Sequence, residues 1–169
     1  MAAPEHDCRD LEQLFDALFG ERYRVRLRGG FDEPLYVPAA AGKPAEVRFR
    51  ADYFASALHE VAHWTLAGAA RRRLLDYGYW YAPDGRDHEA QNRFEAVEVG
   101  PQALEWLFAE AAGYPFRPSL DNLEAGSATH QRFRTALEAE RERRLRLGLP
   151  PRALAFRNAV YECYRSPRG

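Results

Sequence analysis

The sequence SALHEVAHWTLAG, residues 56–68, decides both the local fold and the chemistry of this chain. Apolar residues recur here at the spacing of an amphipathic helix, for which Asp52 is the expected N-cap. His59 and His63 stand four residues apart, so both imidazoles lie on one helix face, at the edge of its apolar side, and can reach one ion. The pattern H-E-x-x-H therefore predicts a metal site. The alternative is two packed histidines and a surface glutamate, Glu60.

The residues before this helix predict another helix and a small sheet. Apolar side chains recur at helical spacing over residues 7–19, and Gly20 follows at the position of a C-terminal cap. Residues 22–28 alternate arginine with apolar side chains, which is the period of a half-buried strand, and Gly29 and Gly30 should end that strand. Shorter strands are expected at residues 35–37 and 47–51.

The second half of the chain predicts further helices. One is expected over residues 87–99 and another from 101 to 112, because Gly100 and Pro101 should interrupt the helical pattern. Two more should follow, hinged at GLPP, residues 148–151. The predicted fold class is therefore α+β, with a small N-terminal sheet packed with about six helices in a single domain over residues 1–169.

Composition and charge limit the possible partners. Lys and Arg number 24 against 25 Asp and Glu, a net charge of -1, so nothing global attracts nucleic acid or an anionic membrane. The N-terminus has no signal-peptide apolar run, and no window reaches about 18 consecutive apolar residues. We expect a cytoplasmic protein that binds neither membrane nor nucleic acid, with Cys8 and Cys163 reduced. The basic runs 71–73 and 141–146 could dock an acidic partner, although such runs are more often solvated helix faces.

A metal site needs a third protein ligand, because two histidines alone hold an ion loosely. Gln91, Glu95 and Glu98 fall at i, i+4 and i+7, which makes a polar stripe on one side of the predicted helix. One of these carboxylates could complete the site, and a solvated helix face explains the same spacing equally well. Weaker candidates are Glu105, Glu110 and Asp76.

The ligand types alone leave the chemistry open. Two histidines and one carboxylate can hold a non-haem Fe(II) that activates dioxygen, with three open coordination positions. The same ligands around zinc, with Glu60 as general base on a bound water, would describe a hydrolase or protease. A third possibility is a non-catalytic helical binding module whose histidines are structural.

Six runs along the chain resemble the bacterial elongation factor P hydroxylase family. They are ALHEVAHWTLAG, DYGYWYAPDGRD, FEAVEVGPQALEW, AAGYPF, DNL and GLPPRALAF, in this order, and they cover the chain from about Tyr53 to Tyr161. The resemblance implies an oxygen-dependent monooxygenase that hydroxylates the lysine of elongation factor P after this lysine has received a β-lysyl group. It implies Fe(II) as the metal and dioxygen as cosubstrate, with the zinc hydrolase as the alternative. The first fifty residues match less distinctively.

The resemblance also assigns roles to individual residues. It implies that His59, His63 and a glutamate of FEAVEV bind the metal, with Glu98 as first choice and Glu95 as second. With Glu98 as ligand, Glu95 one turn before it and Gln102 one turn after it are expected to orient the ligands. Glu60 is expected beside the metal, in a supporting role and not as a ligand. The long cationic side chain of the substrate needs carboxylates or aromatic faces in its pocket, and the loop DYGYWYAPDGRD, residues 76–87, offers both. The alternative is that the aromatic rings of this loop only cover the core. The expected substrate contacts are Asp76, Tyr79, Trp80 and Asp84. No motif identifies the electron donor.

Overall fold

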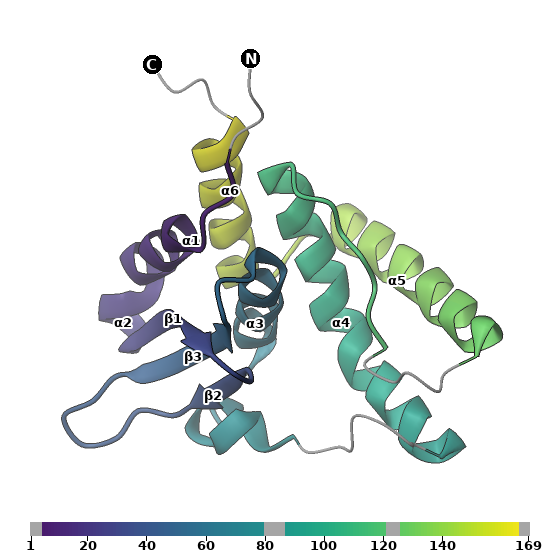
Figure 1. The fold of residues 1–169 in the computed structure, drawn as a ribbon, viewed down its shortest axis with the longest axis horizontal. Coiled ribbons are helices and arrows are strands. Elements are labelled where there is room, and N and C mark those ends of the chain that lie inside the picture. Colours follow the sequence, from purple (N-terminus) through teal and green to yellow (C-terminus); the bar gives the residue numbers. More distant parts are fainter. Residues whose placement is uncertain (1–4, 80–86, 121–125, 166–169) are drawn as a thin grey trace.

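The computed structural model describes residues 5–79, 87–120 and 126–165, and it has the predicted α+β architecture (Figure 1). A small sheet lies beside α3, and α4 and α6 pack on the other side of that helix. One core uses buried residues from Cys8 to Tyr164. The extent of the domain over residues 1–169 stays a prediction. The elements are α1 (Cys8–Phe15), α2 (Glu21–Tyr23), β1 (Val25–Phe31), β2 (Leu35–Val37), β3 (Ala45–Arg50), α3 (Phe54–Leu66), α4 (His88–Ala112), α5 (Ser127–Leu147) and α6 (Pro151–Arg165).

The N-terminal helix does not end at Gly20, so that prediction was wrong. A π-helical segment, Asp16–Gly20, follows α1 and leads directly into α2. The left-handed residue that ends the helix is Arg24, with φ 47°. The helical path through Gly20 buries Phe19 beside Phe15, with ring centroids 5.1 Å apart. This packing keeps the chain helical past the glycine.

The sheet has the strand order β1-β3-β2, with β1 parallel and β2 antiparallel to β3. The strand β1 begins at Val25 and continues through Gly29 and Gly30, so the prediction that these glycines end it was wrong. The register shifts there, and a Cβ on Gly29 would lie 2.4 Å from the ring of Phe49. Gly30 has φ +95° and donates its N–H to the carbonyl of Ala51 at 2.7 Å. The two glycines therefore allow the register shift inside the strand, Gly29 by its close approach to Phe49 and Gly30 by its positive φ.

The helix that carries the two histidines lies in the middle of the fold (Figure 1). It begins at Phe54, and its N-cap is Tyr53 instead of the predicted Asp52. Trp64 is buried on its inner side, where its ring lies 5.0 Å from that of Phe15 and 4.8 Å from that of Phe19. The central position means that one side of α3 contacts the core while another can line a pocket.

One continuous helix, α4, spans His88–Ala112, so the predicted interruption at Gly100 and Pro101 was wrong. Its N-cap is Asp87, whose side chain accepts from the N–H of Ala90. A proline inside a helix costs about 3 kcal/mol in lost hydrogen bonding and steric strain, which the burial of the following helical turns offsets. Gly100 allows a close approach, because a Cβ there would lie 3.4 Å from Cδ1 of Leu66. Residues before and after the proline therefore belong to one helix.

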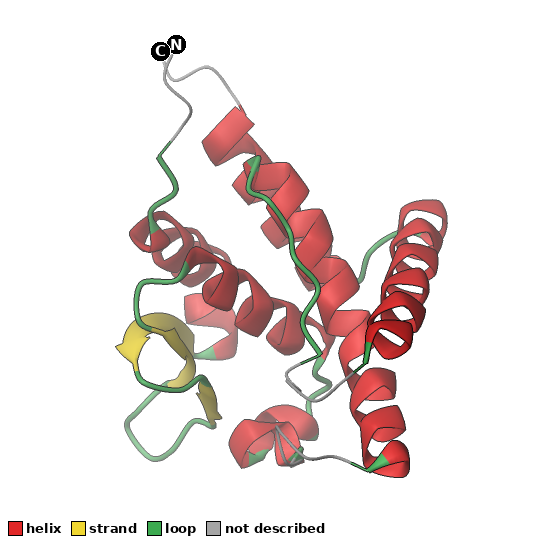
Figure 2. Ribbon diagram, turned by 45° about the vertical axis from the view of Figure 1, so that its right-hand side comes forward, coloured by secondary structure: helices red, strands yellow, loops and turns green. Residues whose placement is uncertain are grey.

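The last two helices belong to different parts of the core. Phe156 of α6 packs with Phe108, their ring centroids 5.0 Å apart, in the main core. The helix α5 packs on α4 through a separate cluster. Figure 2 shows the loop after α4 running back along this helix, and residues 148–150 join α5 to α6 near the predicted hinge. The separate cluster consists of Phe94, Leu120, Phe133 and Leu137.

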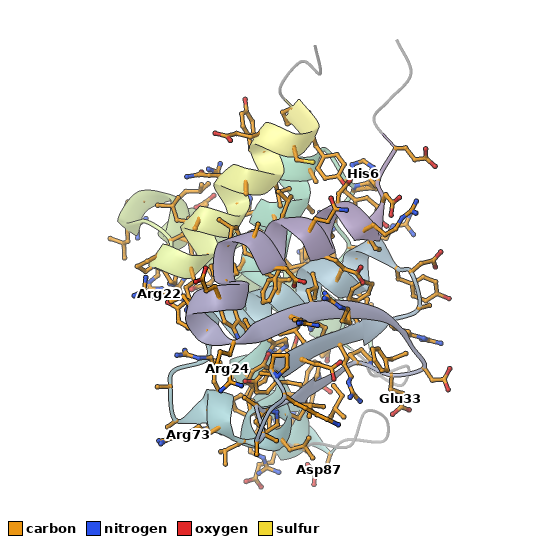
Figure 3. All side chains as sticks on the ribbon, turned by 90° about the vertical axis from the view of Figure 1, so that its left-hand side faces the viewer. His6, Arg22, Arg24, Glu33, Arg73 and Asp87 are labelled. Carbon is orange, nitrogen blue, oxygen red and sulfur yellow. The ribbon has the colours of Figure 1, made fainter. Side chains whose placement is uncertain are left out.

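The surface of the described residues carries many arginines, several of which have acidic partners. Figure 3 shows Arg22, Arg24 and Arg73 on the side of the molecule where the sheet lies. In the run 141–146, Arg141 pairs with Glu110 at 2.6 Å. Docking through the basic runs stays a prediction. Among the described helices none is long and apolar enough to cross a membrane, and both cysteines are free.

Candidate metal centre

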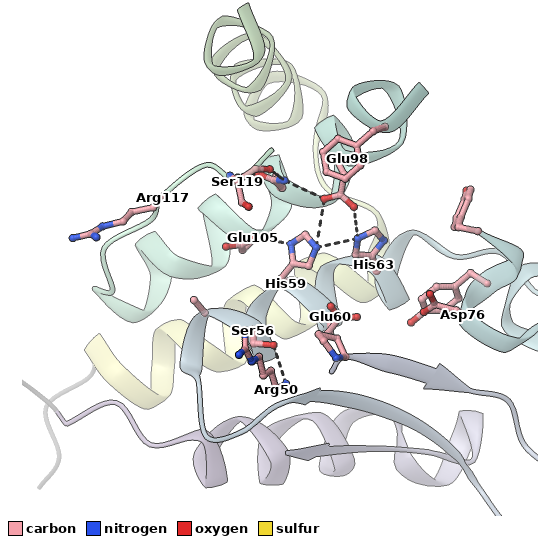
Figure 4. A pocket seen from close by; sticks show the side chains of 16 residues that line it. Arg50, Ser56, His59, Glu60, His63, Asp76, Glu98, Glu105, Arg117 and Ser119 are labelled. Atoms are coloured by element: carbon pink, nitrogen blue, oxygen red, sulfur yellow. Dashed lines mark hydrogen bonds and ion pairs between the residues drawn. The ribbon is translucent and has the colours of Figure 1, made fainter. Parts of the chain in front are cut away.

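Two histidines of α3 meet one glutamate of α4 at the seam between the two helices (Figure 4). The Nε2 atom of His63 lies 2.9 Å from Oε1 of Glu98 and 3.1 Å from Nε2 of His59. The Nε2 atom of His59 lies 3.4 Å from Oε2 of Glu98. One donor atom from each residue lies within 4.8 Å of the others, and in the described part of the chain no other group of three His, Cys, Asp or Glu residues meets this condition.

This donor set fits a divalent ion. Ligands about 2.1 Å from one ion lie roughly 3.0 Å apart at right angles and roughly 3.4 Å apart at tetrahedral angles. The two imidazole nitrogens lie 3.1 Å apart, and each lies near a different oxygen of Glu98, at 2.9 and 3.4 Å, so all three separations fall in that range and the carboxylate presents both oxygens to the site. Imidazole nitrogen and carboxylate oxygen suit iron and zinc alike, so these distances indicate one ion without selecting the metal.

Two further residues of α4 hold the candidate ligands in place. The Nδ1 atom of His59 lies 2.7 Å from Oε1 of Glu105, and because a carboxylate can only accept, Nδ1 carries the donated hydrogen and leaves Nε2 for the ion. The amide of Gln102 donates to Oε2 of Glu98 at 3.1 Å. It also donates to the carbonyl of Ser119 and accepts from its N–H at 2.9 Å. Gln102 therefore contacts Glu98 from one turn further along α4, and its role in orienting a metal ligand stays a prediction.

The contact of Glu105 with His59 was missed from the sequence, which offered Glu105 only as a weak candidate ligand. Glu98, Gln102 and Glu105 fall at i, i+4 and i+7 on α4, so their side chains form one stripe. The expected break at Gly100 and Pro101 divided this stripe between two helices. A prediction of one continuous helix through Pro101 would have placed Glu105 on the same face as Glu98 and suggested the contact with His59.

Mutual attraction dominates the electrostatics of the donor set. Burial opposes protonation of His59, but the charges of Glu98 and Glu105 outweigh it and raise the pKa of His59 to about 10. Burial likewise opposes ionisation of Glu98, yet His63 and His59 hold the pKa of this carboxyl well below its usual range. Without metal the site therefore holds a buried anion paired with a cation, and an incoming ion replaces a proton on His59.

Glu60 lies beside this donor set without belonging to it. It is 8% exposed and forms no hydrogen bond or ion pair with any residue in the described ranges. Burial raises the pKa of Glu60, and the charges of Glu98 and Asp76 act in the same direction against the opposing effect of the histidines. The expected position beside the metal is consistent with this placement, and its role stays a prediction.

A pocket of about 480 Å³ opens onto the donor set. Its walls come from α3, α4, the turn after α3 and the loop after α4. Asp76 and Tyr79, both expected to contact substrate, line it. Trp80 and Asp84, the other two expected contacts, lie outside the described residues. Arg50 and Arg117 also line the pocket.

The turn that carries Asp76 is strained. Asp76, Tyr77 and Gly78 have φ of 49°, 59° and 76°, the left-handed region that only glycine adopts without cost. This turn places the ring of Tyr77 parallel to those of Tyr36 and His63, with centroid distances of 4.3 and 6.3 Å. The backbone N–H of Tyr36 donates to Oδ1 of Asp76 at 3.4 Å. Contacts with the sheet and α3 thus hold the turn against the pocket.

Glu95 points to another partner. Its carboxylate forms an ion pair with Arg132 of α5 at 3.0 Å. The predicted stripe thus divides: Glu98 joins the histidines, whereas Glu95 links α4 to α5. The expected role of Glu95 in orienting the ligands has no contact among the described residues to support it.

Two comparisons identify the family. Residues 14–169 match the family described as elongation factor P hydroxylase. A protein of Haemophilus influenzae named elongation factor P lysine hydroxylase is 45% identical over 161 residues, which is 95% of this chain and 90% of the relative. By both comparisons, this chain belongs to the elongation factor P hydroxylase family.

Proposed function

We propose that this protein hydroxylates the lysine of elongation factor P that carries a β-lysyl group, at an Fe(II) centre held by His59, His63 and Glu98. The family is one of protein-lysine hydroxylases, and its name supplies elongation factor P as the substrate. The observation that carries the metal assignment is the convergence of three donor atoms within 4.8 Å at the floor of a pocket. A translation factor as substrate implies a cytoplasmic enzyme.

Bound Fe(II) would supply dioxygen activation, so that one oxygen atom enters a C–H bond, the other leaves as water, and a donor still to be identified provides two electrons and two protons. The protein contributes orientation. Glu105 fixes the tautomer of His59, and Gln102 ties Glu98 to the loop after α4. These contacts set the ligands before an ion arrives, which lowers the cost of binding it.

The pocket walls support a long cationic side chain as substrate. Asp76 offers a carboxylate and Tyr79 an aromatic face, over which the guanidinium of Arg71 already lies at 4.3 Å from the ring centroid. Trp80 and Asp84 come after Tyr79 in the chain, and we include both among the proposed substrate contacts. Such a pocket selects charge at one end and apolar contact along the stem.

The test begins with the metal. Protein purified without oxygen should contain about one iron per chain, and should consume dioxygen only when modified elongation factor P is added. We expect Glu98→Ala to lose both the iron and the hydroxylation, because the two histidines then hold the ion alone. The measurements are elemental analysis, an oxygen electrode and the mass of the product, which should increase by one oxygen atom.

The matched control for the ligand set is His130→Ala, which removes an exposed histidine of α5 and should leave iron content and rate unchanged. Zinc at the site with water-dependent cleavage of a substrate would replace the proposal by the hydrolase. Full activity in Glu98→Ala would exclude this glutamate as a ligand and would leave Glu95 as the next candidate.

A further inference from the structure

We propose that Glu60 and Asp76 together form the subsite that binds an alkylammonium group of the substrate. This inference rests on the proposed function and specifies which residues recognise the substrate. Both carboxylates line the pocket that contains the donor set. Figure 4 shows them projecting into it from α3 and from the turn after α3. The glutamate of the H-E-x-x-H pattern is thus a specificity residue.

The first observation is that the largely buried carboxylate of Glu60 forms no hydrogen bond or ion pair among the described residues. It is only 8% exposed, yet in ranges 5–79, 87–120 and 126–165 no side chain or backbone group forms a hydrogen bond or ion pair with it. Its carboxylate lines the pocket and is attracted by the neighbouring His59 and His63 without a hydrogen bond, so a cation that enters the pocket can bind it directly. The side chain is therefore poised for a ligand.

The second observation is that Asp76 adds another free acceptor at the cost of backbone strain. Its φ of 49° is unusual for a residue other than glycine, and such strain persists where surrounding contacts enforce it. One carboxylate oxygen accepts the N–H of Tyr36, while no described cation pairs with the group. The nearby Arg71 instead donates to the carbonyl of Tyr77 at 3.0 Å. The negative charge of the turn thus stays available to the pocket.

The third observation concerns the kind of cation. A second metal ion would want a third His, Cys, Asp or Glu donor near Glu60 and Asp76, and the described residues contain no such group apart from His59, His63 and Glu98. An alkylammonium has three N–H donors, which two carboxylates can share, and its methylene stem suits the rings of Tyr77 and Tyr79 in the wall. The two carboxylates and these rings together therefore favour a primary amine on an aliphatic chain.

The subsite can be tested without turnover. The full chain is loaded with zinc, and binding of 1,5-diaminopentane and of uncharged 1-pentanol is followed by NMR or calorimetry. The wild type should prefer the diamine, and Glu60→Gln and Asp76→Asn should each weaken diamine binding about tenfold while barely changing the alcohol. Both substitutions keep the size of the side chain, and asparagine tolerates the left-handed backbone. Zinc content and a thermal melt are measured for every variant.

The control is Glu138→Gln, which removes a surface carboxylate of α5 that pairs with Arg134 and should bind the diamine as the wild type does. Equal diamine binding in all variants, equal affinity for alcohol and diamine, or a second zinc ion lost in Glu60→Gln would overturn the subsite. Hydroxylation of modified elongation factor P by the iron-loaded wild type then decides the proposed function separately. Carboxylate-dependent diamine binding without hydroxylation would leave the subsite and reject that function.

Discussion

His63 and Trp64 are neighbours in the chain and lie on different sides of α3. Trp64 is 1% exposed, lies among aromatic rings, and carries the guanidinium of Arg152 over its ring at 4.5 Å. His63 contacts His59 and Glu98 at the floor of an open pocket. A rotation of about 100° along the helix separates a residue that holds the fold from one that is proposed to hold the metal.

The two sides of α3 differ in what offsets the cost of burying their side chains. On the Trp64 side, apolar area leaves water and contributes directly to the free energy of folding. On the His63 side, buried charges are balanced mainly by one another, an arrangement that stabilises a fold weakly or not at all. We therefore expect substitutions on the Trp64 side to reduce stability and substitutions on the His63 side to reduce metal binding.

The largest expected effect tests that separation with the adjacent pair. Trp64→Ala should lower the free energy of unfolding by about 3–5 kcal/mol, because it leaves a cavity among Phe15, Phe19 and Tyr23. His63→Ala should remove the bound metal and change the unfolding of the metal-free protein much less. Urea unfolding of both metal-free variants, with iron content measured under native conditions, checks the pair. Similar losses of stability in both variants would break the comparison.

A smaller effect is expected from the residue that orients His59. Glu105→Ala removes the carboxylate 2.7 Å from Nδ1 and should weaken metal binding about 10–100-fold, without removing a ligand. Glu110→Ala is the matched control on the same helix, because its carboxylate binds Arg141 at the surface. Competition with a metal-binding dye measures both affinities. An unchanged affinity in Glu105→Ala would mean that packing alone holds the imidazole.

The smallest expected effect is the pH dependence of stability that comes from the Cys8 thiol, which belongs to the same core as Trp64. Burial raises the pKa of the Cys8 thiol from 9.0 to about 11, and the thiol donates to the carbonyl of Asp52 at 3.0 Å. Because the folded pKa is the higher one, this contribution to stability is complete below pH 9 and is lost as the pH rises through about 11. A Cys163→Ser variant leaves one thiol to follow. We expect slow alkylation of the folded protein at pH 8 and rapid alkylation in urea.

The fold was largely predictable because its periods are local. The alternation at Val25 and Leu27 and the helical spacing around His59 correctly indicated strand and helix. The errors came from glycine and proline. Gly20, Gly29 and Pro101 were expected to end elements, and each lies inside one, because burial of neighbouring side chains outweighed the local preference.

The spacing of His59 and His63 was enough to place both on one face of α3, since four residues are close to one helical turn whatever surrounds the helix. The sequence also supplied the runs that identify the family. The tertiary structure alone decided which carboxylate meets them. Glu95 and Glu98 belong to the same polar stripe of the predicted helix, so the helical spacing does not distinguish them. Only the packing of α3 and α5 against α4 directs Glu98 to the histidines and Glu95 to Arg132. Contacts between elements distant in the chain have no local period, so no pattern within one helix could reveal them.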